Sequence, residues 1–192
     1  MIVIINGPSG SGKTTLGEYF KTLGMQEIVS TTTRKMRPGE VQGVSYYFVE
    51  EEAFFQKERI EESEYAGHYY AVTKEEVEAK RALGVPLFAS LDIRGVKAMK
   101  ALYGPEVLVV YLKLSRTKLK ERMAKRGDSI ASIRSRLAHH RATREDLNEQ
   151  YADYVLWNNG SPQKLYRQAR RILEQEGIVT SSQGIAPRSS KS

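Results

Sequence analysis

The chain has 192 residues, with 30 Lys and Arg against 23 Asp and Glu, so its net charge is +7. A hydrophobic fraction of 40% with 28% charged residues is typical of a globular protein, and the length suits one domain or one core with an inserted lobe. No apolar run approaches the roughly 20 residues that span a bilayer. With no cysteine, the sequence excludes a disulfide framework and a thiolate zinc site. We expect a cytoplasmic protein that has no secretory leader and no membrane contact.

The positive charge is concentrated in one segment. Residues 113–144 hold 11 basic residues against Glu121 and Asp128, a net charge of +9, which leaves −2 for the remainder. Such a stripe is typical of nucleic-acid binding, of a lid that closes over polyphosphate, or of a helix face that only meets solvent. Composition alone leaves these three alternatives open.

Apolar runs bounded by turn residues alternate with helical patterns along the chain. The expected strands lie at 2–5, 28–31, 46–49, 86–91, 107–112 and 154–157. The expected helices lie at 13–23, 51–57, 73–84, 115–126, from 129 onward, and 162–177. This alternation predicts an α/β fold with a parallel sheet.

Some side chains carry more detailed predictions. Thr73 and Glu76 match a capping box, in which each side chain is expected to bond the backbone amide of the other. Phe54 and Phe55 are expected to face the interior. In the helix after residue 128, one face is formed by Ile130, Ile133, Leu137, His140 and Leu147.

A glycine-rich loop joins the first strand to the first helix. Gly7-Pro8-Ser9-Gly10-Ser11-Gly12-Lys13-Thr14 matches G-x-x-x-x-G-K-[ST], the pattern of a phosphate-binding loop. The glycines let backbone amides turn onto a polyphosphate, Lys13 neutralises its β and γ oxygens, and the Thr14 hydroxyl ligates Mg²⁺. We assign ATP binding to these eight residues and to Thr15, which follows them. GTPases, helicases and small-molecule kinases share this loop, so it does not identify the phosphoryl acceptor.

A second motif addresses the acceptor. Residues 30–48 read STTTRKMRPGEVQGVSYYF. Together with Glu61, Gly67-His68-Tyr69-Tyr70, Asp92, Arg126-Gly127 and Arg136, this segment resembles the signature of guanylate kinases, and the resemblance extends over about residues 1–177.

The resemblance implies a fold in three parts. A P-loop NTPase-type core with a three-layer parallel sheet is expected at 1–29, 80–125 and 150–177. A monophosphate-binding lobe of about 30–79 and a basic helical lid of about 126–149 are inserted into it. Residues 178–192 lack a pattern and are expected to form a disordered tail.

The resemblance also implies a reaction, the reversible Mg²⁺-dependent transfer of the γ-phosphoryl group of ATP to GMP. The residues that it assigns to GMP are Ser30, Arg34, Arg37, Glu40, Tyr46, Glu61, Tyr70 and Asp92. Guanidinium and phenol groups suit a phosphate dianion, and a carboxylate can accept from the adjacent N1–H and N2–H₂ donors of guanine. The catalytic positive charge is assigned to Lys13, Arg34, Arg126 and Arg136, with Arg126 and Asn158 also placed at ATP.

Several positions depart from the family pattern, and two of them bear on the reaction. Val72, in Tyr70-Ala71-Val72, replaces a hydroxyl expected near guanine O6, and Ser90 stands where many members have an aspartate near the metal-bound phosphates. These departures leave open a kinase for another phosphorylated acceptor. A non-catalytic module that binds phosphoproteins is a further alternative. We do not expect a nucleic-acid partner, and a monomer and a homodimer both remain open.

Overall fold

Five parallel strands form the central sheet of the computed structural model, which describes residues 1–65, 67–125, 127–142 and 145–180. Their order across the sheet is β2-β7-β1-β8-β9. The bounds are β1 Ile2–Asn6, β2 Gln26–Glu27, β7 Leu87–Ser90, β8 Val107–Lys113 and β9 Tyr154–Trp157. These strands confirm the expected α/β fold with a parallel sheet.

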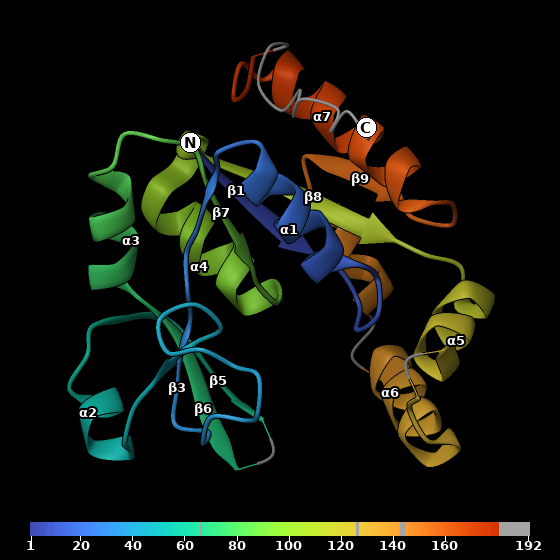
Figure 1. Cartoon of the computed structure of the whole chain (residues 1–192), viewed down its shortest axis with the longest axis horizontal. Helices are drawn as coiled ribbons and strands as arrows, with labels where there is room; N and C mark the ends of the chain where they lie inside the picture. Colours follow the sequence, from blue (N-terminus) through green and yellow to red (C-terminus); the bar gives the residue numbers. More distant parts are fainter. Residues whose placement is uncertain (66, 126, 143–144, 181–192) are drawn as a thin grey trace, which may run out of the picture.

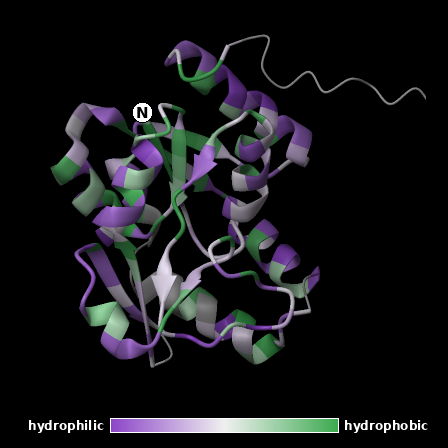
Figure 2. Ribbon diagram, turned by 60° about the vertical axis from the view of Figure 1, so that its left-hand side comes forward, coloured by the Kyte–Doolittle hydropathy of each residue, from purple (hydrophilic) through white to green (hydrophobic). Residues whose placement is uncertain are grey.

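Alternate side chains of the strands enter two separate cores. Val3 and Ile5 pack with α1 (Lys13–Thr22) and α7 (Pro162–Gln175), whereas Ile2 and Ile4 pack on the opposite face with α4 (Ile93–Tyr103). All residues of β1 are buried, as expected for a strand that is covered on both faces. The result is a three-layer sandwich, and hydrophobic residues are concentrated in its central strands, such as β1 (Figures 1 and 2).

A second, smaller sheet lies at one end of the core (Figure 1). Its strand order is β4-β3-β6-β5, with bounds β3 Thr31–Thr32, β4 Tyr47–Phe48, β5 Arg59–Tyr65 and β6 His68–Thr73. The helices α2 (Glu51–Phe55) and α3 (Lys74–Arg81) accompany it, and α3 leads back into β7. We call residues 30–79, the lobe predicted from the sequence to bind the acceptor, the acceptor lobe.

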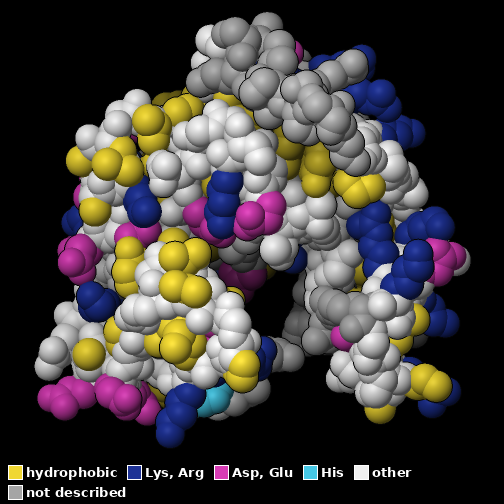
Figure 3. All heavy atoms as spheres, in the orientation of Figure 1, with side chains coloured by type: hydrophobic (Ala, Val, Ile, Leu, Met, Phe, Trp, Pro, Cys, Tyr) yellow, Lys and Arg dark blue, Asp and Glu magenta, His cyan; other side chains and the backbone are white. Residues whose placement is uncertain are grey.

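A helical hairpin projects from the other side of the core. It consists of α5 (Arg116–Lys125) and α6 (Ile130–Ala142), and short 3₁₀ turns lie at η1 (Gly104–Glu106) and η2 (Glu145–Tyr151). Leu119, Met123 and Ile133 form a small core of the hairpin that is separate from the two main cores. Figure 3 shows the molecule hollowed between this hairpin and the acceptor lobe.

The expected strand at 28–31 is wrong as a single element. β2 belongs to the central sheet, whereas β3 belongs to the sheet of the acceptor lobe, and residues 28–30 connect the two. An apolar run cannot reveal that its two ends pair in different sheets, because pairing depends on strands distant in sequence.

The hairpin of β5 and β6 was not among the expected elements. β5 reads RIEESEY, and its acidic residues outweigh the weak alternation of apolar ones. Its antiparallel pairing with β6, which includes Glu61 opposite Val72 and Ser63 opposite Tyr70, supplies the missing stabilisation.

The capping box is half confirmed. The Thr73 hydroxyl accepts from the Glu76 amide at 3.3 Å, as expected, and caps α3. The Glu76 side chain does not return to Thr73, because its carboxylate accepts from the amide of Val29 and the hydroxyl of Tyr47.

Three predictions about the placement of individual residues are corrected. Phe54 is fully buried, but Phe55 on the same short helix is 44% exposed. α6 ends at Ala142, so Leu147 belongs to η2 and not to the helix face expected to contain it. Ile178 and Val179, expected to begin a disordered tail, are buried in the core beside α7, and residues 181–192 lie outside the described residues.

Candidate active site

The phosphate-binding loop runs from the end of β1 into the first turn of α1, as predicted. Gly7, Gly10 and Gly12 have φ values of 144°, 83° and 102°, a region in which side chains with a Cβ are strained. A Cβ on Gly12 would also lie 2.5 Å from Nδ2 of Asn158. The loop therefore needs glycine for both backbone conformation and space.

A pocket of about 700 Å³ opens over this loop. Its lining includes the predicted donor residues Ser9, Gly10, Gly12, Lys13, Thr14, Thr15 and Asn158. The Lys13 ammonium donates to the carbonyls of Gly7 and Pro8 at 2.6 and 3.2 Å, so it lies folded over the loop. Ser11 of the same loop is completely buried.

Arg122 is a pocket residue that sequence reasoning missed. From α5 it donates to the carbonyl of Ser11 at 3.3 Å and to that of Asn158 at 2.7 Å. Asn158 Nδ2 donates to the same Ser11 carbonyl at 2.7 Å. Arg122 lies four residues before Arg126 in the helix that the sequence predicts at 115–126, and this spacing was the signal that could have identified it. We call Ser11, Arg122 and Asn158 the loop latch.

The aromatic residues of the acceptor motif gather around Arg34. Its guanidinium carbon lies 5.5 Å from the ring centre of Tyr46 and 5.6 Å from that of Phe48. Tyr46 and Tyr70 meet edge to face at 5.8 Å, and burial raises the pKa of Tyr46. Arg34 is only 8% exposed. The structure thus brings together three of the residues predicted to hold the acceptor phosphate.

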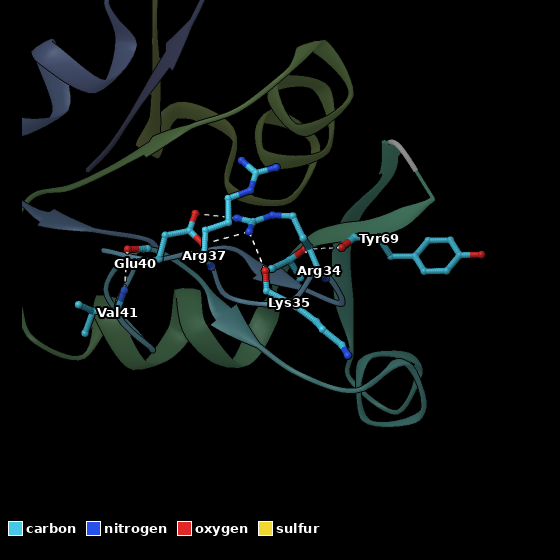
Figure 4. A network of polar contacts seen from close by, with 8 residues as sticks. Arg34, Lys35, Arg37, Glu40, Val41 and Tyr69 are labelled. Carbon is cyan, nitrogen blue, oxygen red and sulfur yellow. Dashed lines mark hydrogen bonds and ion pairs between the residues drawn. The ribbon is translucent and has the colours of Figure 1, made fainter.

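Glu40 forms an ion pair with Arg34 (Figure 4). Nη2 and Nη1 of Arg34 donate to its two carboxylate oxygens at 2.7 and 3.0 Å, and the Arg37 amide donates to one of them at 2.7 Å. The hydrogen bond from Arg34 lowers the pKa of Glu40. Arg37 points its guanidinium away from this ion pair (Figure 4). The Glu40 carboxylate, which the sequence places at GMP, thus contacts Arg34 and the Arg37 backbone. Because a carboxylate repels a phosphate, Glu40 suits a role in holding Arg34 better than one in binding the phosphate itself.

The predicted base-binding carboxylates lie close together. Glu61 on β5 has one carboxylate oxygen, Oε2, that is buried without a hydrogen-bond partner. Burial, and then the nearby charge of Asp92, raise the pKa of Glu61 to about 7. Asp92 caps α4 by accepting from the amides of Arg94 and Gly95 at 2.8 and 3.0 Å. An orphaned acceptor of this kind suits a ligand that brings N–H donors.

The structure also shows where the residues lie that depart from the family pattern. Ala71 and Val72 are fully buried, and Val72 packs in the core with α4, so it offers no hydrogen bond to a ligand. Ser90 ends β7 and is exposed. Ser30 joins the central sheet to the acceptor lobe, and its carbonyl accepts from the Tyr47 amide at 2.9 Å.

Strand pairing brings the two halves of the site to one edge of the sheet. Ile5 of β1 lies opposite Ser90 of β7 in parallel register. Two residues beyond each of them are Gly7, which begins the phosphate-binding loop, and Asp92. The carboxyl ends of neighbouring parallel strands are a usual place for nucleotide sites.

Two predicted lid residues cannot be placed. Arg126 lies outside the described residues, and the side chain of Arg136 on α6 does too. Across the described ranges no group of three or more His, Cys, Asp or Glu could hold a metal ion. No helix within the same ranges is long and apolar enough to cross a bilayer.

Comparisons with known proteins agree with this geometry. The sequence model of the family described as guanylate kinase matches residues 1–176. The chain is 36% identical over 166 residues to a guanylate kinase of Syntrophus aciditrophicus, covering 82% of this chain and 78% of the relative. It is 33% identical over 182 residues to one of Synechocystis, covering 91% and 94%.

A solved structure extends the match to three dimensions. The crystal structure of guanylate kinase from Anaplasma phagocytophilum superposes with a TM-score of 0.69 at 25% identity, covering 94% of this chain and 87% of that one. Sequence and fold therefore agree, and the chain belongs to the guanylate kinase family of nucleoside monophosphate kinases.

Proposed function

We propose that the chain transfers the γ-phosphoryl group of Mg·ATP to GMP, with ATP on the phosphate-binding loop and GMP in the acceptor lobe. The observation that carries the choice of guanine is the buried, unpartnered Oε2 of Glu61. Guanine offers two adjacent N–H donors to a carboxylate, whereas adenine presents an acceptor at N1. Asp92 supplies a second carboxylate at the same end of the site.

The donor half of the site binds the triphosphate. Backbone amides of the loop and the N-terminus of α1 face the β and γ phosphates, and Lys13 leaves the loop carbonyls to neutralise them. The exposed Thr14 hydroxyl suits a Mg²⁺ ion that arrives with ATP, because Mg²⁺ keeps most of its waters and takes few protein ligands. When bound, Mg²⁺ neutralises the charge that spreads over the transferred phosphoryl group.

The acceptor half holds the phosphate of GMP. Arg34 and Arg37 provide guanidinium forks, and Tyr46 and Tyr70 provide phenolic donors beside Arg34. Glu40 orients Arg34 through two hydrogen bonds. Ser30 is assigned to guanine O6, where buried Val72 contributes nothing.

The chemistry requires no general base. A phosphate monoester has its second pKa near ~6, so the attacking oxygen of GMP is already anionic at neutral pH. The protein must instead align two anions that repel each other and exclude water. Lys13 and Arg34 supply positive charge from the two halves, and we assign Arg126 and Arg136 to the same task on closure of the lid.

The donor pocket gives Arg122 a role as well. Its hydrogen bonds hold the Ser11 carbonyl and the end of β9 in place, and it lines the pocket next to Lys13. Asn158 shares this contact, which supports the prediction that it lies at the ATP site. We further infer a cytoplasmic enzyme that works as a monomer or a homodimer.

The test measures ADP release from Mg·ATP with GMP, dGMP, AMP, CMP, UMP and phosphorylated sugars. We expect turnover with GMP and dGMP alone. Lys13→Ala should abolish turnover while GMP binding, measured by calorimetry, stays within about twofold, because Lys13 acts on the donor. Turnover confined to another acceptor would replace GMP, and tight phosphopeptide binding without turnover would favour the non-catalytic module.

A further inference from the structure

Glu76 is a buried carboxylate that the proposed reaction does not use. It lies in the first turn of α3 and is 7% exposed. A buried carboxylate is costly unless its oxygens are hydrogen-bonded, so its partners show what it holds.

Both carboxylate oxygens reach across to other segments. Oε1 accepts from the Val29 amide at 3.0 Å, and Oε2 accepts from the Tyr47 hydroxyl at 3.0 Å. Lys80, one turn further along α3, brings its ammonium to 3.9 Å from Oε1. One side chain thus joins a helix, an interstrand connection and a strand.

These contacts lie where the chain crosses between the two sheets. Val29 stands in the connection from β2 of the central sheet to β3 of the acceptor lobe. Glu76 stands on the return path, in the helix that runs from β6 of the lobe to β7 of the central sheet. Glu76 therefore ties the outgoing crossing to the returning one.

Each partner of Glu76 is next in sequence to a residue assigned to GMP. Val29 precedes Ser30, and Tyr47 follows Tyr46. The Tyr47 amide also donates to the Ser30 carbonyl at 2.9 Å, which couples the two neighbours directly. In an extended segment neighbouring side chains point to opposite faces, so fixing Tyr47 on one face fixes Tyr46 on the other.

We propose that Glu76 is a positioning residue for the acceptor site, which sets the places of Ser30 and Tyr46 by holding Val29 and Tyr47. It touches neither substrate. A misplacement of about 1 Å at a binding group can cost about 100-fold in rate, so losing this carboxylate should weaken GMP binding and leave ATP binding unchanged.

The test compares Glu76→Ala, Glu76→Gln and Tyr47→Phe in steady-state assays and in GMP calorimetry. Glu76→Ala should raise the KM and Kd for GMP about tenfold or more, with the KM for ATP within about twofold. Glu76→Gln should recover most of the loss, because its amide oxygen still accepts from Val29 and its NH₂ can donate to Tyr47. Tyr47→Phe removes only the hydrogen bond from Tyr47 to Glu76, so its KM and Kd for GMP should lie between those of Glu76→Gln and Glu76→Ala.

Glu75→Ala is the matched control. Glu75 is the neighbour of Glu76 in the first turn of α3, but its side chain is 79% exposed and pairs with Lys57. This variant should keep the parental KM for both substrates. A pocket of about 270 Å³ lined by Tyr47, Glu76 and Thr73 adjoins the site, so water can reach the groups freed in Glu76→Ala.

The outcomes separate the possibilities. The proposal is overturned if folded Glu76→Ala keeps the parental Kd for GMP, or if the KM for ATP rises in parallel with that for GMP. If Glu76→Ala does not fold, Tyr47→Phe decides, and an unchanged GMP Kd there overturns the proposal. The inference rests on the proposed function, and a parent protein that does not phosphorylate GMP refutes that function instead.

Discussion

Glu61, the carboxylate that we propose binds the guanine base, has a pKa near neutral pH. Glu61 has its pKa raised to about 7 because burial disfavours its charged form and Asp92 adds a like charge. Only the ionised form can accept from both guanine donors, since a protonated carboxyl places an O–H against one of them. The same burial that orphans Oε2 thereby makes GMP binding sensitive to pH.

GMP affinity should fall as the pH falls through 7. With a pKa of about 7, the ionised fraction of Glu61 is about tenfold smaller near pH 6 than near pH 8, so the Kd for GMP should rise about tenfold. The GMP phosphate also titrates near ~6, so the control is Glu61→Gln, which keeps only that dependence. Calorimetry at several pH values checks this, and parallel profiles for the two proteins would contradict it.

The same group should lower stability at high pH. Because its folded-state pKa is above the unfolded value, the folded state holds the proton more tightly, and stability falls as the pH rises from about 4.5 through about 7. Glu61→Gln should therefore have a free energy of unfolding about 1–3 kcal/mol above that of the parent near pH 8, and should differ little from it near pH 5. Equal differences at both pH values in thermal denaturation would argue against this.

At the scale of the elements, the phosphate-binding loop is held by contacts with segments distant in sequence. Asn158 of the loop latch fills the space where Gly12 would carry a Cβ, and the Ser11 carbonyl accepts from both Asn158 and Arg122. The end of β9 and the helix α5 thus shape a loop that begins after β1. This explains why residues far apart in sequence determine the donor site.

Gly12→Ala should disable the loop. Gly12 has a φ of 102°, and its new Cβ would lie 2.5 Å from Asn158 Nδ2, so the loop or the latch must move. We expect kcat/KM for ATP to fall by about 100-fold or more. The control is Gly84→Ala, where φ is 67° and no atom lies within 4 Å of the Cβ, so only about 1–2 kcal/mol of backbone strain is added. Similar losses of activity in both variants would refute the steric argument.

Local patterns predicted the elements that carry a continuous apolar run or clear turn residues, wherever their pairing partners lie in the sequence. The loop between β1 and α1 and the strands β7, β8 and β9 were expected because continuous apolar runs and turn residues mark them. The β5–β6 hairpin was not, because acidic Glu61 and Glu62 make β5 look solvated until it pairs. The acceptor residues were predicted from the resemblance, whereas the Arg34–Glu40 pair and the loop latch depend on three-dimensional contacts that no local pattern contains.

At the scale of the whole molecule, the two ends of the described chain contribute to the same hydrophobic core. Val3 at the start of β1 and Val179 beyond α7 belong to the same core cluster. The segment after α7 therefore contributes to the core that supports α1 and the phosphate-binding loop. Its composition gave no sign of this, because two apolar residues precede a polar stretch.

Ile178→Ala should destabilise the fold without altering the site. Ile178 is 8% exposed, and truncating a buried isoleucine costs about 2–4 kcal/mol. Ile130→Ala is the matched control, since that isoleucine is 72% exposed and its loss should cost less than about 0.5 kcal/mol. Urea denaturation measures both, and equal midpoints would show that Ile178 does not stabilise the core.

The ion pair between Arg34 and Glu40 has a consequence for the anions that can bind in the acceptor lobe. Before a substrate binds, the charge of Arg34 is already balanced inside the acceptor lobe by two hydrogen bonds from its guanidinium to Glu40. A small anion such as inorganic phosphate would compete with Glu40 for Arg34 and would bring no base to contact Glu61. GMP brings both groups at once. We therefore expect free phosphate and sulfate to be weak inhibitors, because neither offsets the loss of the Arg34–Glu40 ion pair with a contact at Glu61.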